Sequence, residues 1–487
     1  MKQKMIELQP ACIWENFAKI CAIPHPSKHE EQMVRFIISI AKKHNLFTYI
    51  DTAGNVIIRK PATTGYENLK TVTLQSHLDM VPQKNSDIAH NFVLDPIKPY
   101  IDGEWVTAEN TTLGADNGIG VATILSLLEA TDIPHGPLEA LFTIDEEAGM
   151  TGVFNLEENM LQGEILINLD SEDEGELYVG CAGGVNTQAT FHYKQSDTPD
   201  NYSCYTLTFS GFKGGHSGVD IQLERGNPNQ ETARLLLDLI NEYEVEVGCI
   251  NGGTLRNAIP REVVSMVAIP DKYLLQVKNL ITKFETTLCT ELANRAPDLK
   301  LTLAPTQDNS PSLEKSQIKN ILKAIISCPN GVLRMSTEMA GVVESSSNMG
   351  MIKTTDETIE IYTLQRASHN SLRSLAAERV RHVFELAGAQ VKHDGEYPGW
   401  VPELDSQILK IMKLTYEEMY NITPKVLVIH AGLECGIIHS KYPHMEMISL
   451  GPTICFPHSP DEKVNIKSVE KFWHYLLKSL TVIPTKV

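Results

Sequence analysis

Leu-Phe-Thr-Ile-Asp-Glu-Glu-Ala-Gly-Met, residues 141–150, is the stretch that decides the fold. The mostly apolar run 138–144 ends in three adjacent acids, Asp145, Glu146 and Glu147, which is typical of a buried strand that delivers carboxylates to the rim of a sheet. Neighbouring carboxylates repel one another unless a cation lies among them or one is protonated. Taken alone, a solvated acidic turn is the simpler interpretation. A metal site therefore requires partners from the rest of the chain.

The length and composition describe a large globular protein. With 487 residues the chain is too long for one hydrophobic core, so we expect at least two domains. Apolar residues make up 42% and charged residues 21%, which argues against disorder. Acids outnumber bases by 61 to 42, giving a net charge of −19. Such a surface repels nucleic acids and anionic membranes, and we expect neither as a partner.

Cysteine usage and the N-terminal residues indicate the compartment. The nine cysteines are scattered and never spaced C-x-x-C, so they predict neither a disulfide framework nor a thiolate zinc site. The N-terminus lacks the apolar core of a signal peptide, and no apolar run approaches the roughly 20 residues that span a bilayer. We expect a soluble cytoplasmic protein.

Strand-like and helix-like segments alternate up to Asp170 and resume after residue 400. This alternation predicts an α/β protein, a three-layer α/β/α domain with a largely parallel sheet. Ser27 and Glu30 form a capping-box pattern that predicts a helix start. Between the two parts, two rounds of strand and helix predict an inserted α+β domain with antiparallel sheet, although no sequence repeat proves a duplication. The expected domains are 1–186 with 400–487, and 187–399.

Polar residues recur where the chain leaves the predicted sheet. Each of them follows a predicted strand or precedes a predicted helix: His77, Asp116, Glu146, Glu147 and Asp170. In open α/β sheets, ligands bind outside the carboxyl ends of the strands. Independent acidic turns would not all have to fall at that edge.

Each motif is weak on its own. His77-Leu-Asp79 places two polar side chains on one face of a strand end, where a carboxylate can hold a ligand histidine, but such pairs are usually surface residues. Asp116 follows a glycine-punctuated loop and could bridge two cations or simply cap a helix. His458 lies in a loop made stiff by two prolines, where histidines are usually plain surface residues.

In combination these residues predict a metal centre. Two histidines and several carboxylates, without thiolates, suit zinc, cobalt or manganese. Two such ions roughly 3.5–4 Å apart, bridged by a carboxylate and a water, are a standard hydrolytic arrangement. One acid of the Glu146–Glu147 pair can bind metal while its neighbour serves as general base.

At this point the chain resembles a known family, the cocatalytic-zinc exopeptidases that include carnosinases and carboxypeptidase G-type enzymes. The resemblance covers nearly the whole chain in the family's order. The matching stretches are His77-Leu-Asp-Met-Val-Pro-Gln-Lys-Asn85, Thr111-Thr-Leu-Gly-Ala-Asp-Asn-Gly-Ile-Gly120, Asp145-Glu-Glu-Ala-Gly-Met-Thr-Gly152, Gly214-Gly-His-Ser-Gly218, Asn257-Ala-Ile-Pro-Arg-Glu262, His430-Ala-Gly-Leu-Glu-Cys-Gly436 and Pro457-His-Ser-Pro-Asp-Glu462.

The resemblance implies a role for each matching residue of the predicted catalytic domain. His77 and Asp170 would hold one zinc, Glu147 and His458 the other, and Asp116 would bridge them. Asp79 would orient His77. Glu146 would deprotonate the bridging water, whose hydroxide attacks the peptide bond, and would later protonate the leaving amine. The family also implies a cis peptide between Asp116 and Asn117.

The inserted segment resembles the family's lid, which would close over the substrate. His216 would polarise the scissile carbonyl, and Asn257 and Arg366 would hold the substrate, with Arg366 on its free carboxylate. From the residues alone, Arg366 could instead be a surface residue of a strand and Asn257 a turn former. Two departures from the family pattern stand out. Asn110 replaces a usual glycine, and Cys455-Phe456 replaces small residues beside His458.

The activity implied is that of a cytosolic metallo-dipeptidase. It would hydrolyse unblocked dipeptides, including Xaa-His and β-alanyl-histidine, with two divalent metal ions per chain, zinc before cobalt or manganese. An N-acyl-amino-acid deacylase or a tripeptidase of the same clan, and an inactive scaffold, are the alternatives. The protein would be a monomer or a homodimer. In a dimer, His216 could serve its own active site or its partner's.

Overall fold

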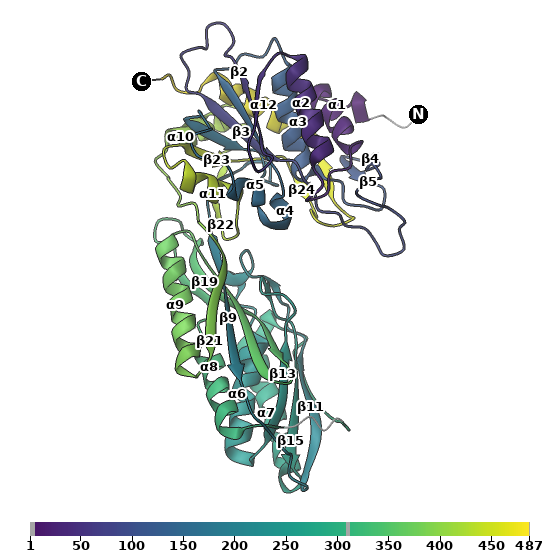
Figure 1. Ribbon diagram of the computed structural model, residues 1–487, viewed down its shortest axis with the longest axis vertical. Coiled ribbons are helices and arrows are strands. Elements are labelled where there is room, and N and C mark those ends of the chain that lie inside the picture. The colour runs from purple at the N-terminus through teal and green to yellow at the C-terminus, as the bar shows by residue number, and fades with distance from the viewer. Residues whose placement is uncertain (1–4, 308–311, 487) are drawn as a thin grey trace. The chain divides into compact units, whose positions relative to one another are not determined.

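The computed structural model describes residues 5–307 and 312–486 and divides into two compact units. Unit 1 comprises residues 1–180, 400–428 and 433–487, and unit 2 comprises residues 181–399 and 429–432. Each unit has its own sheet and its own hydrophobic core (Figure 1).

Unit 1 is built on an eight-stranded sheet in the order β1-β2-β6-β3-β7-β23-β8-β22. β3 pairs in parallel with both β6 and β7, and β7 pairs in parallel with β23. The pairs β1–β2, β2–β6 and β23–β8 are antiparallel, so the expected parallel sheet holds for the four central strands and not for the margins. The strands are β1 (Phe47–Ile50), β2 (Val56–Lys60), β3 (Val72–His77), β6 (Leu138–Thr143), β7 (Ile165–Asn168), β8 (Glu176–Cys181), β22 (Lys425–Ile429) and β23 (Glu446–Ser449).

Helices lie on both faces of this sheet, which gives the predicted three layers. Alternate strand residues such as Val56, Ile58, Leu74 and Ile167 join one core with five helices: α1 (Ala11–Cys21), α2 (Glu31–Lys43), α3 (Ala115–Glu129), α10 (Gln407–Tyr420) and α12 (Ile466–Thr481). The opposite face carries shorter helices: α4 (Glu146–Gly149), α5 (Thr151–Phe154) and α11 (Glu434–Lys441). A separate four-stranded sheet joins β24 (Ile454–Cys455), β25 (Lys463–Asn465), β5 (Trp105–Ala108) and β4 (Pro99–Asp102).

Unit 2 contains two β-α-β-β-α-β halves that share one mostly antiparallel sheet. In both halves the fourth strand lies beside the first, the first beside the third, and the third beside the second. One half consists of β11 (Tyr202–Ser210), α6 (Pro228–Tyr243), β13 (Glu246–Gly252), β15 (Val263–Pro270), α7 (Leu274–Leu292) and β16 (Lys300–Pro305). The other consists of β9 (Gly183–His192), α8 (Lys315–Ser327), β19 (Val343–Thr354), β20 (Thr358–Ala367), α9 (Asn370–Leu386) and β21 (Gln390–Tyr397), with β18 (Gly331–Met335) pairing with β19.

The two halves meet where β13 pairs with β19 through Gly252 and Ile352. All four helices pack on one face of the sheet around a single core. The duplication that no sequence repeat revealed is therefore visible in the order of the elements. The first half is inserted between β9 and α8 of the second.

The boundary between the units differs from the one expected from sequence. Residues 181–186 belong to unit 2 and not to unit 1, because residues 183–186 form the start of β9, which pairs with β20 and β21. The four residues 429–432 also belong to unit 2, although unit 1 flanks them on both sides. A local change of sequence texture does not show which sheet a strand joins.

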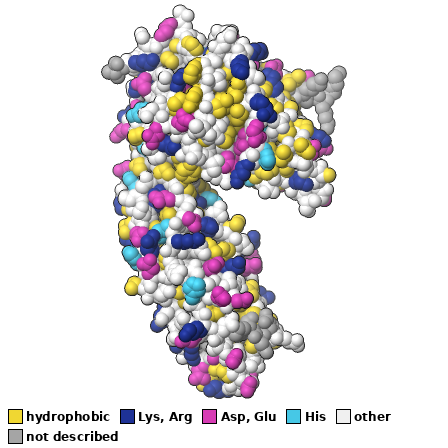
Figure 2. All heavy atoms as spheres, in the orientation of Figure 1, with side chains coloured by type: hydrophobic (Ala, Val, Ile, Leu, Met, Phe, Trp, Pro, Cys, Tyr) yellow, Lys and Arg dark blue, Asp and Glu magenta, His cyan; other side chains and the backbone are white. Residues whose placement is uncertain are grey.

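Charged side chains of both signs lie on the surface. In the visible face of Figure 2, Lys and Arg side chains are interspersed with Asp and Glu and form no continuous basic area. No helix of residues 5–307 and 312–486 is long and apolar enough to cross a membrane.

Candidate metal centre and substrate-binding residues

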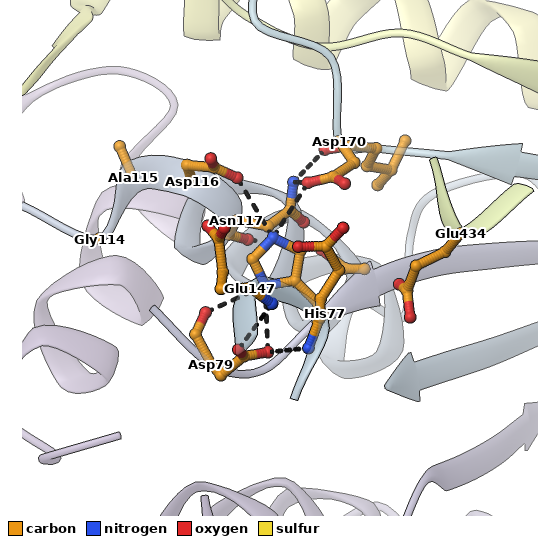
Figure 3. A network of polar contacts seen from close by, with 12 residues as sticks. His77, Asp79, Gly114, Ala115, Asp116, Asn117, Glu147, Asp170 and Glu434 are labelled. Atoms are coloured by element: carbon orange, nitrogen blue, oxygen red, sulfur yellow. Dashed lines mark hydrogen bonds and ion pairs between the residues drawn. The ribbon is translucent and has the colours of Figure 1, made fainter. Parts of the chain in front are cut away.

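Strand ends bring the predicted ligands of unit 1 together. β3 ends at His77, Asp170 follows β7, and Glu146 and Glu147 follow β6. Because these strands are parallel neighbours, their carboxyl ends share one edge of the sheet. Asp116 reaches the same edge from the first turn of α3, and His458 from a loop. Figure 3 shows His77, Asp116, Glu147 and Asp170 gathered in this way.

The first group of ligands surrounds His77, which is 1% exposed. Its Nε2 lies 3.2 Å from Asp116 Oδ1 and 3.2 Å from Asp170 Oδ1. Its Nδ1 donates to the backbone carbonyl of Asp79 at 3.0 Å, since a carbonyl oxygen can only accept. That contact orients the ring and directs Nε2 at the two carboxylates.

The second group surrounds His458. Its Nε2 lies 3.0 Å from Glu147 Oε1 and 3.4 Å from Asp116 Oδ2. Asp116 thus offers one carboxylate oxygen to each histidine. This is the arrangement expected of a residue that bridges two ions, and all five predicted ligands belong to it.

The donor set fits divalent cations. The groups His77–Asp116–Asp170 and Asp116–Glu147–His458 each place one ligand atom per residue within 4.8 Å of the others. Nitrogen and carboxylate oxygen donors without thiolates suit zinc, cobalt or manganese.

The ionisation of these groups shows why the cluster needs positive charge. Burial raises the pKa of Asp170 to about 6 and raises that of Glu146 well above its ordinary value. Burial alone would also raise the pKa of Asp116, but hydrogen bonds from His458 and His77 outweigh it and lower the pKa. Burial thus disfavours the charged form of all three acids, and only at Asp116, which contacts both histidines, do the histidine contacts outweigh it.

Asp79 positions the acids after β6. Its Oδ1 accepts the backbone N–H of Glu146 at 2.9 Å, and its Oδ2 accepts that of Glu147 at 3.1 Å. These are the first N–H groups of α4, which have no partner within the helix. The carboxylate also lies 3.5 Å from His77 Nδ1. The contacts with the α4 N–H groups were not predicted, and the orienting role of Asp79 toward His77 stays a prediction.

The residues of the predicted capping box serve this site and not a helix end. Ser27 Oγ donates to Asp79 Oδ2 at 2.7 Å, and Glu30 Oε1 accepts the backbone N–H of Asp145 at 3.1 Å. Helix α2 begins after Glu30 without any side-chain cap. The capping-box prediction was wrong because both side chains form tertiary contacts, which a local pattern does not reveal.

The loop before α3 has the backbone expected from sequence. Asn110 adopts a φ of +64° in the left-handed region, which asparagine tolerates, and the Asp116–Asn117 peptide is cis. Asn117 Nδ2 donates to Asp170 Oδ1 at 2.6 Å. Beside His458, Phe456 is 60% exposed, so the larger side chain noted in the sequence faces solvent in this structure.

Glu434 is a buried acid beside the candidate metal centre. It lies in the motif His430-Ala-Gly-Leu-Glu-Cys-Gly436, but the sequence predicted no role for it. Its Oε2 accepts from Gln75 Nε2 at 2.6 Å and from Thr143 Oγ1 at 2.7 Å, while its Oε1 has no partner among the described residues. Burial raises its pKa to about 8. Figure 3 shows Glu434 on the Asp170 side of the network. No local signal distinguishes it from other acids at a helix start.

In unit 2 the short strands β12 (Gly215–His216) and β14 (Ala258–Ile259) bring His216 and Asn257 together, which were both predicted to contact the substrate. His216 pairs with Ala258, next to Asn257, and the Asn257 carbonyl accepts the backbone N–H of Ser217 at 3.0 Å. His216 Nδ1 accepts backbone N–H groups from Gly218 and Val219 at 3.1 and 3.2 Å. The ring proton is therefore on Nε2, and burial together with Arg366 lowers the pKa of the ring.

Arg366 lies at the end of β20 and is 5% exposed, so it is not the surface residue that the sequence left open. Its Nη1 donates to the Tyr397 hydroxyl at 2.7 Å, and its Nε and Nη2 both lie 3.4 Å from Ser217 Oγ. Gly184 makes room for this contact, because a Cβ there would lie 2.6 Å from the Tyr397 ring. Among the described residues, no carboxylate pairs with this buried guanidinium. A buried charge without an ionic partner is costly.

Comparison with known proteins agrees with this geometry. The family model described as peptidase family M20/M25/M40 matches residues 73–481. The chain belongs to this peptidase family. The M20 chain is 45% identical over 483 residues to a protein of Escherichia coli (strain K12) named cytosol non-specific dipeptidase, covering 99% of this chain and 100% of the relative.

Solved structures extend the comparison of the M20 chain. Aminoacylhistidine dipeptidase from Vibrio alginolyticus superposes with a TM-score of 0.93 at 47% identity, over 100% of this chain and 99% of the other. The aminopeptidase PepT of Bacillus cereus gives a TM-score of 0.57 at 16% identity, over 97% of this chain and 98% of the other, which shows a shared fold alone.

Proposed function

We propose that this M20 peptidase is a metallo-dipeptidase that hydrolyses unblocked dipeptides with two divalent metal ions. The observation that carries the proposal is Asp116, which directs one carboxylate oxygen to His77 and the other to His458, while Glu146 lies near His77 and Glu147. The names of the two relatives that match over the full chain support a dipeptidase, including action on Xaa-His peptides.

His77, Asp116 and Asp170 would hold one ion, and Asp116, Glu147 and His458 the other. Zinc is the ion we expect, with cobalt and manganese as functional substitutes. Bound divalent ions lower the pKa of a water molecule and polarise a carbonyl oxygen. The remaining steps fall to side chains.

Glu146 is the proton carrier. It takes a proton from the attacking water and later delivers it to the nitrogen of the leaving amine. A group that must hold the proton between these two steps benefits from a raised pKa, and burial raises the pKa of Glu146. Asp79 keeps Glu146 in place through the backbone N–H that it accepts.

Unit 2 would bind the substrate. Arg366 has a buried guanidinium with no acidic partner, which suits the free carboxylate of a dipeptide. His216 is neutral and carries its proton on Nε2, so it is suited to donate to the scissile carbonyl oxygen as negative charge develops there. Ser217 contacts both Asn257 and Arg366. The residues proposed to bind substrate therefore lie together within a single chain, although they come from both halves of unit 2. That is consistent with a monomer as well as with a dimer.

The alternatives within the clan receive less support. In sequence, relatives named peptidase T match only short parts of the chain, for example 32% identity over 112 residues, or 21% of this chain. No observation favours a blocked substrate, and an inactive scaffold would not need Glu146.

The compartment that we propose is the cytoplasm, which the name of the Escherichia coli relative supports.

A substrate panel tests the function. Free dipeptides such as Gly-His and β-alanyl-histidine should be cleaved. Amidation of the C-terminal carboxylate should lower kcat/KM by about 10- to 100-fold, because it leaves Arg366 buried and unpaired. N-acetylated dipeptides and tripeptides, measured at the same concentrations, should be poor substrates. A preference for N-acetylated amino acids would instead establish a deacylase, and a preference for tripeptides a tripeptidase.

A further inference from the structure

Glu462 makes four contacts to a single loop of unit 1. It is 2% exposed, and its two carboxylate oxygens accept hydrogen bonds from four consecutive backbone N–H groups. The donors to Oε2 are Leu113 N at 2.7 Å and Gly114 N at 3.0 Å, and the donors to Oε1 are Ala115 N at 2.8 Å and Asp116 N at 3.2 Å. The last of these N–H groups belongs to the residue placed between the two metal positions.

The four amides lie where the chain enters α3. Leu113 and Gly114 precede the helix, and the N–H groups of Ala115 and Asp116, its first residues, have no partner within it. Gly114, the residue at the N-cap, has a left-handed backbone and provides no side-chain cap. A buried carboxylate from a distant part of the chain therefore satisfies the whole turn, as anions do at convergent backbone amides.

Glu462 is equally fixed to the His458 loop. Its own backbone N–H donates to the Ser459 carbonyl at 3.0 Å, which closes the turn directly after His458. Its carbonyl accepts from Thr107 Oγ1 at 2.7 Å, and β25 begins at the next residue and pairs with β5. The side chain and backbone of this one residue thus connect the loop that carries Asp116 to the loop that carries His458.

We propose that Glu462 is a positioning residue that sets the spacing between Asp116 and His458 before any metal ion binds. The proposal rests on the proposed metal function for its consequence, although the contacts themselves need no metal. Glutamine has the same shape but replaces one acceptor oxygen with an NH2 group, which would face backbone donors. Two of the four bonds would be lost, and the loop around Leu113–Asp116 would loosen.

The test compares Glu462→Gln with Asp461→Asn. Asp461 is the preceding residue, its side chain is exposed, and its replacement removes the same charge from the same loop without touching the four amides. Hydrogen exchange of residues 113–116 is measured in the metal-free full-length proteins, and Co²⁺ binding is titrated by its visible absorption. Glu462→Asp, which keeps the charge with a shorter reach, replaces the glutamine variant if the latter does not fold.

We expect faster exchange at residues 113–116 and a dissociation constant for Co²⁺ about 10- to 100-fold higher in Glu462→Gln, with Asp461→Asn like the wild type. Activity of Glu462→Gln should return with excess metal, at an unchanged KM for the dipeptide. Wild-type exchange or wild-type Co²⁺ affinity in this variant would overturn the proposal. If the wild type itself bound fewer than two ions, the dinuclear proposal would fail, and the exchange comparison would still decide the role of Glu462.

Discussion

Glu146→Gln is expected to lower kcat by about 10²- to 10⁴-fold while leaving the metal content of the protein unchanged. Glutamine keeps the shape of the side chain and the backbone N–H that Asp79 accepts, but it cannot take a proton from water. Glu146 belongs to neither of the two ligand groups that contain Asp116, although it forms a third candidate group with His77 and Glu147, so the metal content of the variant decides between a base and a ligand. The variant therefore separates proton transfer from metal binding.

Glu158→Gln is the matched control, since it makes the same substitution at an exposed residue of the same segment. Turnover is measured with a free dipeptide, and metal content by elemental analysis of the same samples. Normal turnover by Glu146→Gln would show that another group carries the proton. Loss of metal in step with activity would show that Glu146 is a ligand.

Asp116→Asn is expected to remove both metal ions and, with them, nearly all activity. Its two oxygens face His77 and His458, so it is the one acid shared by both ligand groups. Loss of an outer-shell partner weakens metal binding by about 10- to 100-fold. Loss of a direct ligand should weaken the binding of each ion by more than that. The measurement is metal content after dialysis against metal-free buffer.

Asp170→Asn provides the comparison for this prediction. Asp170 contacts His77 and is absent from the group around His458, so its replacement should weaken one ion and spare the other. Equal losses in the two variants would contradict a bridging role for Asp116. Two ions retained in Asp116→Asn would contradict it outright.

The catalytic unit was predictable because its signals are local. Apolar runs that end in His77 or in Glu146 and Glu147 indicate strand ends, and parallel strands place their carboxyl ends at one edge. That argument located four of the five predicted ligands, whereas His458 was taken from a proline-flanked loop, and the structure brings all five together. Bridging was one of two possibilities left open for Asp116 by its loop, and the family resemblance favoured it. The roles of the lid residues came from the resemblance alone, since no spacing rule implies them.

The features that escaped prediction depend on tertiary contacts. β19 contains Glu344-Ser-Ser-Ser-Asn348, which lacks the alternation of apolar and polar residues typical of a strand. Residues 345–348 are nevertheless buried, because neighbouring strands and side chains form hydrogen bonds with their polar groups. Glu462 and Glu434 act on partners hundreds of residues away, and Ser27 and Glu30 satisfy a helix-capping pattern without capping a helix. Sequence rules for local structure carry no information about such partners.

The central claim is that the active protein holds two metal ions within a dipeptidase site. The most direct measurement is metal content per chain on freshly purified protein, compared with its activity on β-alanyl-histidine as metal is removed and restored. The account predicts about two divalent ions per chain at full activity and loss of turnover as they are removed. Full activity with metal well below two per chain would contradict it.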